Sequence, residues 1–299
     1  MSNLLLFKGE LAALSAALIW AIASVVYTGV GRQISPLTLN FTKGWIALIL
    51  LILTFVITGQ AIPSIDLTGF LLLFLSGMIG IGFGDTAYFS ALNCIGARQT
   101  LLFEMLAPPL SAMLALIFLN ETLEPQAWIG IVLTIAGVIW VTLERVSDRH
   151  GNFRPLQGSL YGLLAAFGQS GGAVLSRAAL INTEIDSLWS TFIRLLGGTI
   201  ALLIWLILQQ QTTDIRKPLQ SRRLISIIAG TAFISTYLGI LLQQTSLKFA
   251  ATGIAQALSS TSPLFVLPIA GAMGERISLR SISGVLIALI GVSLLFYRP

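Results

Sequence analysis

The chain is a succession of long apolar runs separated by short polar breaks. Each run holds about 20 residues, and a helix of that length crosses the roughly 30 Å hydrocarbon core of a bilayer. The pattern predicts ten membrane-spanning helices, at residues 10–29, 37–58, 67–92, 99–119, 126–144, 156–180, 187–208, 224–247, 252–273 and 279–296. We therefore expect an all-α integral membrane protein.

The composition agrees with this interpretation. Of the 299 residues, 56% are hydrophobic and 10% are charged, whereas a soluble chain carries about 25% charged residues. The net charge of +5 lies mostly in the predicted loops, where it favours anionic lipid headgroups over nucleic acid as a partner. Cys94 and His150 are the single cysteine and histidine. An intramolecular disulfide is therefore impossible, and neither a metal site nor another cofactor is expected.

The chain contains an internal repeat. The stretch 96–141 returns without a gap at 250–295, at a constant distance of 154 residues. Matched pairs include Ala97 and Ala251, Pro109 and Pro263, Glu121 and Glu275, Gly130 and Gly284, and Gly137 and Gly291. Solenoid repeats recur every 20–50 residues or so, and this longer period instead indicates a duplicated membrane unit.

The repeat and the spans together define two halves. Residues 1–144 form the first predicted repeat of five helices, 145–155 a polar linker, and 156–299 the second repeat of five helices. Because five is an odd number, two homologous halves must cross the bilayer in opposite directions. This arrangement is an inverted-topology repeat, and transporters that have it place the substrate site near the midplane between the repeats.

The distribution of basic residues predicts an orientation. The loops after the odd-numbered spans carry eleven Lys and Arg residues, from Arg32 to Arg280. The opposite side carries four, which are Lys8, Arg177, Lys248 and Arg298. Because positively charged loops are retained in the cytoplasm, this bias predicts that both termini lie outside.

Small residues and prolines predict where the helices pack closely and where they bend. Gly80 with Gly84 and Gly168 with Gly172 follow the small-xxx-small pattern of close helix contacts. Glycine is also common in membrane helices generally, which is the alternative explanation. Prolines that remove backbone hydrogen bonds from the fourth and ninth spans are Pro108, Pro109, Pro263 and Pro268.

Four charged residues stand out inside the predicted spans, away from the first and last few residues of each span: Lys43, Asp85, Glu104 and Arg194. A charge in the hydrocarbon region costs about 2.5–3.5 kcal/mol, so each is a candidate functional residue. Counted from the same side of the membrane, the first three lie at similar depth, and they can form one layer in which the lysine pairs with a carboxylate. Asp85 and Glu104 are candidates to bind a proton. The alternative is a structural ion pair that only locks helices together.

The second half places a different set of polar groups at the mirrored depth. Arg194 holds the place of Lys43, and Gln243, Gln244 and Gln256 lie near it, without an intramembrane carboxylate. We expect a polar central cavity closed at each end by one of these layers. Further residues expected to line it are Trp20, Tyr88 and Gln169.

Several short segments occur in an order and spacing that is shared with a known group of transporters. In the first half they are Leu18-Ile19-Trp20, Gly84–Leu92, Pro109-Leu110, and Asn120-Glu121 followed by Gly130 and Gly137. In the second half they are Arg194 with Gly197-Gly198, Thr261–Phe265, and Gly274-Glu275-Arg276 followed by Gly284 and Gly291. With these segments, the chain resembles the EamA type of the drug/metabolite transporter superfamily over nearly its full length, in two copies.

The resemblance implies a ten-helix carrier with an inverted repeat, a central cavity and alternating access for metabolites, amino acids or drugs. It also implies cytoplasmic termini, the reverse of what the basic residues predict. The chain departs from the family pattern at Ala21, where glycine is usual, and at Glu104, where the fourth span normally has no charge. Glu104 therefore bears on the class of substrate.

The leading hypothesis is a secondary transporter of a small metabolite that is amino acid-like, nucleoside-like or drug-like. Protons are the candidate coupling ion, a bacterial inner (plasma) membrane is the expected location, and the protein is expected to be a monomer or homodimer. The alternative is a membrane scaffold or sensor without transport. The chain lacks a phosphate-binding G-x-x-x-x-G-K-[ST] loop and an H-E-x-x-H motif, which argues against ATP-driven transport and against an intramembrane metalloenzyme.

Overall fold

The computed structural model describes residues 7–60, 63, 65–119, 125–142, 154–180, 185–210, 217–249, 258–274 and 277–295. Across these ranges the regular elements are helices, and no strand occurs. The first half consists of α2 (Lys8–Val30), α3 (Pro36–Thr58), α4 (Leu67–Gly77), η1 (Met78–Gly84), α5 (Asp85–Glu104), α6 (Ala107–Leu119) and α7 (Pro125–Thr142). The second half consists of α8 (Pro155–Leu180), α9 (Ser187–Leu208), α10 (Lys217–Gln220), α11 (Arg222–Ala232), η3 (Phe233–Leu238), α12 (Gly239–Phe249), α14 (Ser262–Ala272) and α15 (Leu279–Leu295).

The helices have the length and composition of membrane spans. Within the described ranges, five helical stretches are long and apolar enough to cross a bilayer, and four shorter apolar helices accompany them. The fold class predicted from the sequence, an all-α membrane protein made of two repeats, is confirmed. Most of the predicted linker 145–155 lies outside the described residues.

The boundary between the third and fourth spans differs from the prediction. The helix does not end at Leu92 but runs on to Gly96, whose backbone has φ 76° and ψ 173°. This positive φ is open to glycine and strained for most other residues, so Gly96 separates the two spans. The fourth span itself is interrupted at Met105–Leu106. Pro108 and Pro109 follow after one residue, and they cannot donate backbone hydrogen bonds.

The two repeats share their irregularities as well as their helices. The third span contains the π-helical segment η1 (Met78–Gly84), and the eighth contains η3 (Phe233–Leu238). Shifting η1 by the 154-residue repeat gives 232–238, so the two segments occupy equivalent places. The breaks at 105–106 in the fourth span and at 260–261 in the ninth correspond to within one residue. The sequence predicted kinks at the prolines but not the π-helical turns.

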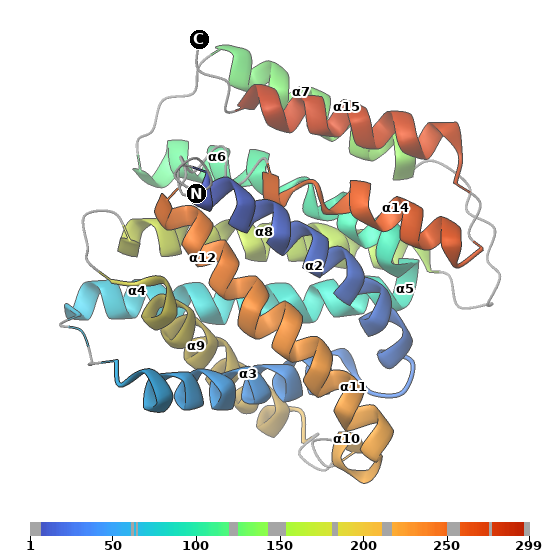
Figure 1. Ribbon diagram of the computed structural model, residues 1–299. Coiled ribbons are helices and arrows are strands. Elements are labelled where there is room, and N and C mark those ends of the chain that lie inside the picture. The colour runs from blue at the N-terminus through green and yellow to red at the C-terminus, as the bar shows by residue number, and fades with distance from the viewer. Residues whose placement is uncertain are drawn as a thin grey trace.

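The halves are interleaved, and their contacts are related by exchange of the repeats. α4 and η1 pack on α8 and α9, and the equivalent α11 and η3 pack on α2 and α3. α6 packs on α8 as α14 packs on α2, and α7 packs on its own equivalent, α15. Figure 1 shows α7 and α15 side by side at the top of the view. This exchange, with an odd number of spans in each half, is what an inverted repeat requires.

Glycines let α8 approach the third span closely, as the sequence predicted. A Cβ at Gly168 would lie 2.6 Å from the Cα of Gly84, and one at Gly172 would lie 2.9 Å from the Cα of Gly80. The two small-xxx-small motifs therefore pack against each other. No larger residue fits there without separating the backbones.

Candidate substrate cavity

A cavity of about 150 Å³ lies between the two repeats. At roughly 10–15 Å³ per water molecule, it has room for about ten waters or a small solute. Its lining includes eight of the nine residues expected from the sequence, namely Trp20, Lys43, Asp85, Tyr88, Glu104, Gln169, Arg194 and Gln243. The ninth, Gln256, lies outside the described residues.

Lys43 is paired with Asp85 in the wall of the cavity. Its Nζ lies 2.5 Å from Asp85 Oδ2 and 5.1 Å from the centroid of the Phe89 ring. Gln169, from α8, donates its Nε2 to the other carboxylate oxygen at 2.7 Å. Both oxygens of Asp85 are therefore engaged. The sequence left the partner of Lys43 open between Asp85 and Glu104, and the structure identifies it as Asp85.

The π-helical turn η1 positions this ion pair. A π-helical turn disrupts the regular hydrogen-bond ladder, and a carbonyl left without a donor is costly where no water can reach it. Asn40, fully buried on α3, donates to the carbonyl oxygen of Ile81 at 2.7 Å and to Thr86 Oγ1 at 2.9 Å. Residues three apart share a helix face, so the contacts of Asn40 direct Lys43 towards Asp85.

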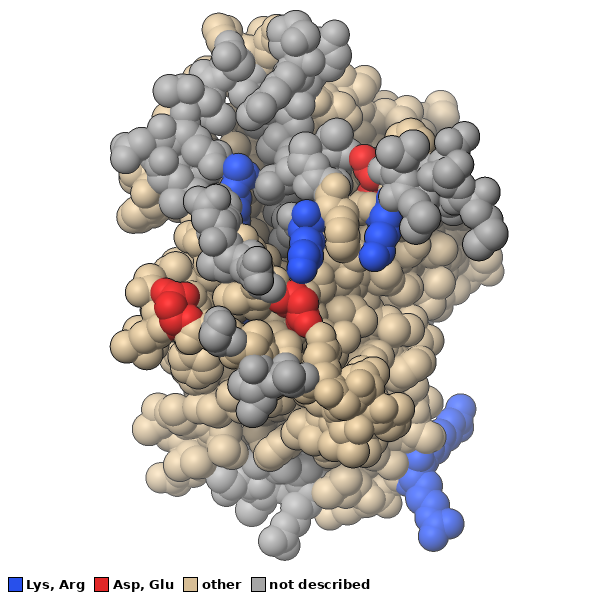
Figure 2. Space-filling model, turned by 60° about the vertical axis from the view of Figure 1, so that its left-hand side comes forward, with Lys and Arg blue, Asp and Glu red and all other residues tan. Residues whose placement is uncertain are grey.

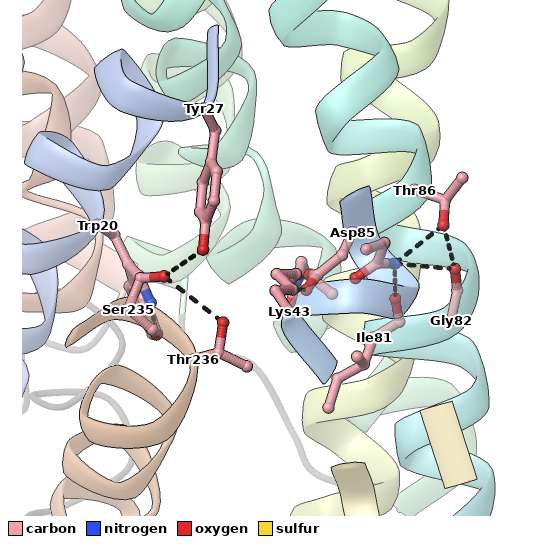
Figure 3. Close-up of polar contacts among 11 residues, drawn as sticks. Trp20, Tyr27, Lys43, Ile81, Gly82, Asp85, Thr86, Ser235 and Thr236 are labelled. Atoms are coloured by element: carbon pink, nitrogen blue, oxygen red, sulfur yellow. Dashed lines mark hydrogen bonds and ion pairs between the residues drawn. The ribbon is translucent and has the colours of Figure 1, made fainter. Parts of the chain in front are cut away.

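The opposite wall is uncharged and is built around η3. Trp20 donates its Nε1 to the carbonyl oxygen of Ser235 at 3.0 Å. The hydroxyl oxygens of Tyr27 and Ser235 lie 3.0 Å apart, and Ser235 and Thr236 are 3.5 Å apart. Figure 3 shows these hydrogen-bonded side chains facing the Lys43–Asp85 pair. Sequence reasoning did not select Tyr27, Ser235 or Thr236, because a lone hydroxyl in a span gives a weak signal.

Two ionisable residues in the lining have buried polar atoms without a hydrogen-bond partner among the described residues. Oε1 of Glu104 is buried without a hydrogen bond, at the end of α5 and next to the break at 105–106. Arg194, on α9, is 3% exposed, and its Nε has no acceptor. A buried charge without a partner is expensive, so these groups are suited to bind a solute or an ion that supplies one.

The two glutamines on α12 have different surroundings. Gln243 belongs to the cavity lining. Gln244 is fully buried outside that lining and accepts a hydrogen bond from Ser190 Oγ at 3.2 Å. The polar layer expected in the second half is therefore divided between the cavity and the contact of α12 with α9.

Charge is scarce among the described residues of the face that Figure 2 shows. Figure 2 shows a mainly uncharged face with a few separate Lys, Arg, Asp and Glu side chains. Large apolar side chains point outwards along the spans, such as Val56 at 74% exposed and Ile139 at 52% exposed. This surface suits lipid, and Lys43, Asp85, Glu104 and Arg194 lie inside it around the cavity.

Comparisons with known proteins agree with this architecture. An uncharacterized transporter of Archaeoglobus fulgidus is 27% identical over 291 residues, which cover 97% of this chain and 98% of that protein. An uncharacterized transporter of Clostridium kluyveri is 29% identical over 128 residues, which cover 42% of this chain and 41% of that one. A crystal structure with 16% sequence identity superposes with a TM-score of 0.69 and covers 96% of both chains, which shows that the fold is shared.

The family comparison covers both halves. The model of the EamA-like transporter family matches residues 7–143 and again residues 156–297. These matches cover most of the chain in two copies, in agreement with the internal repeat and with the exchange of contacts between the halves. The chain belongs to the EamA-like transporter family and is an integral membrane transporter.

Proposed function

We propose that the protein is a secondary carrier that moves a small polar metabolite across the plasma membrane by alternating access. One observation carries this proposal. A polar cavity lies between two inverted repeats, and equivalent elements of both repeats line it, including η1 with η3 and the broken fourth span with the broken ninth. Interrupted helices around a site between inverted repeats are typical of secondary transporters.

Alternating access requires two interfaces between the repeats, of which one is closed while the other is open. The third span packs on α8 through glycines, with backbones in direct contact and little space between them. The equivalent contact, between the eighth span and α2, is made by the Trp20 side chain and the hydroxyl chain of Tyr27 and Ser235, which line the cavity. Rocking one repeat against the other would tighten the second interface and loosen the first.

Glu104 is the proposed coupling residue. Among the described carboxylates of the cavity, Asp85 is held by two donors, whereas Glu104 has none. A carboxyl group without a fixed donor can take up and release a proton as the break beside it changes its exposure. In this scheme Asp85 holds the helices together and Glu104 carries the proton.

Purified protein in liposomes tests the carrier and its coupling. We expect the protein to exchange labelled metabolites across the bilayer and to accumulate them when a pH gradient is imposed. Glu104→Gln should retain exchange and lose at least about 90% of the gradient-driven accumulation, because it cannot release a proton. Glu10→Gln is the matched control, since Glu10 lies at the start of α2 outside the cavity lining.

Two results would contradict the proposal in different ways. Unchanged accumulation by Glu104→Gln would remove Glu104 from coupling but leave the carrier intact. A protein that is folded but exchanges none of a broad set of amino acids, nucleosides, sugars and organic ions would favour the scaffold or sensor.

A further inference from the structure

We propose that Arg194 binds a carboxylate group of the transported solute. The substrates of this carrier are then compounds that carry a carboxylate group. The inference rests on the proposed function and adds the class of substrate. It arises from a carboxylate that the first repeat has and the second repeat lacks.

The two cations lie at the same depth in equivalent helices, at an offset of 151 residues rather than 154. Lys43 is the eighth residue of α3, and Arg194 is the eighth residue of α9. In the first repeat, Lys43 is neutralised by Asp85, the residue that follows η1. The equivalent residue after η3 is Gly239, which lies 154 positions later and has no side chain. The second repeat therefore has the cation without its acid.

The space of the missing acid is occupied by an uncharged group. In the first repeat, Gln169 of α8 bonds to Asp85. In the second, a Cβ at Gly239 would lie 2.7 Å from the Trp20 Nε1 of α2. Trp20 therefore closes this wall, and its N–H donates to the carbonyl oxygen of Ser235. An indole N–H has no acceptor to offer, so Trp20 cannot replace the missing carboxylate as the partner of Arg194. An acceptor for the guanidinium must come from elsewhere.

The guanidinium is placed to receive a ligand. Arg194 lines the cavity, and its Nη2 lies 3.4 Å from where a Cβ of Gly80 would stand. Because Gly80 has no side chain, nothing from this position covers the guanidinium. A buried guanidinium prefers a bidentate carboxylate, which neutralises its charge and satisfies two donors at once.

The charges of the cavity favour a single negative charge on the ligand. Asp85 interacts electrostatically with Arg194 but forms its ion pair with Lys43. Arg194 thus remains without an ion-pair partner among the described residues, and Glu104, which also lines the cavity, would repel a doubly charged anion more than a singly charged one. A carboxylate fits this balance better than a phosphate does.

Thermal unfolding of the purified protein tests this inference without knowledge of the natural substrate. The probes are acetate, butyrate, 4-methylpentanoate and benzoate, with the amide of each acid, sodium chloride and sodium sulfate as comparisons. We expect at least one acid to raise the melting temperature saturably, by about 3 °C at roughly ten times its Kd, because it binds the folded state only. The amides and inorganic ions should have no such effect.

Arg194→Gln should weaken binding of that acid at least about 30-fold, because the charged partner is lost. Arg222→Gln, the same change at the exposed start of α11, should leave binding as in the native chain. The inference is overturned if no acid stabilises the protein saturably, if chloride or the amides stabilise it equally, or if Arg194→Gln binds the acid as well as the native chain.

A second variant covers the case in which Arg194→Gln does not fold. Trp20→Gln with Gly239→Asp rebuilds in the second repeat the Gln–Asp pair of the first, and the new carboxylate should neutralise Arg194 from within. This variant should bind the acid at least about 30-fold more weakly than Trp20→Gln alone. Equal binding by the two variants would overturn the inference.

Failure of this inference and failure of the carrier give different results. If the acid binds through Arg194 but no solute crosses liposomes, the carboxylate site stands and the carrier fails. If solutes cross but no carboxylate binds saturably, the carrier stands and the substrate class is wrong.

Discussion

Asp85 and Glu104 are both carboxylates in the cavity, yet their surroundings differ. Asp85 receives donors from Lys43 and Gln169, and Glu104 has no hydrogen-bond partner among the described residues. Their depth in the sequence marked both as candidates, because a charge in a membrane span stands out on composition alone. Depth could not decide which acid meets Lys43, since that depends on the rotation of each helix and on the turn at η1.

The Lys43–Asp85 pair predicts the outcome of a double-mutant cycle on stability. Lys43→Ala strands a buried carboxylate and should cost about 3–5 kcal/mol of stability. Lys43→Ala combined with Asp85→Asn leaves no charge and should be more stable than Lys43→Ala alone. Thermal or denaturant unfolding of the four proteins of this cycle measures the coupling. Additive effects would argue that the contact contributes no interaction energy.

Small-xxx-small spacing predicted close packing, and the structure places Gly168 on Gly84 and Gly172 on Gly80. The π-helical turns were not predicted, because the glycine cluster at Gly77–Gly84 indicates a weakened helix but not the geometry that replaces it. The equivalent segment Phe233–Leu238 lacks such a cluster, so its π-helical turn had no local signal in the sequence.

A glycine comparison tests the packing of α8 on the third span. Gly168→Ala brings a Cβ within 2.6 Å of the Gly84 backbone, which cannot move aside as a flexible side chain would. We expect a loss of about 1–3 kcal/mol in stability. Gly230→Ala is the control, because nothing lies within 4 Å of its added Cβ. That variant should be neutral or gain up to about 1 kcal/mol through helix propensity. Similar effects of the two changes would contradict the close contact.

A second element-scale prediction concerns Asn40, which ties α3 to η1. Asn40→Ala leaves the carbonyl oxygen of Ile81 without this donor in a site that is closed to water, at a cost of about 1–3 kcal/mol. Thr58→Ala, at the exposed end of the same helix, is the matched control and should change stability by less than about 0.5 kcal/mol. Equal stability of the two variants would show that η1 does not depend on Asn40.

On the scale of the whole molecule, the sequence was most informative. A constant 154-residue period and five spans in each half are sufficient to predict an inverted repeat, and the contact of α4 with α8 is matched by that of α11 with α2. For the orientation of the protein in the membrane, the basic residues and the family resemblance give opposite predictions. The excess of basic residues after odd-numbered spans predicts that Arg222 faces the cytoplasm, whereas the family resemblance predicts the opposite.

A cysteine in place of Arg222 decides the orientation. Cys94 is first changed to serine, so that the added thiol is the single one in the chain. Labelling with a membrane-impermeant reagent from inside only would support the basic-residue prediction and place both termini outside. Labelling from outside only would support the topology of the family.

The most direct test of alternating access uses the same background with Ser259→Cys, because Ser259 lines the cavity next to the break in the ninth span. An impermeant thiol reagent is added to right-side-out vesicles and, separately, to inside-out vesicles, with the Arg222→Cys protein as the one-sided reference. If the cavity opens in turn to each side, the Ser259→Cys protein will be labelled in both preparations, and a bound substrate will slow both reactions. Labelling from one side only, with and without substrate, would contradict the carrier.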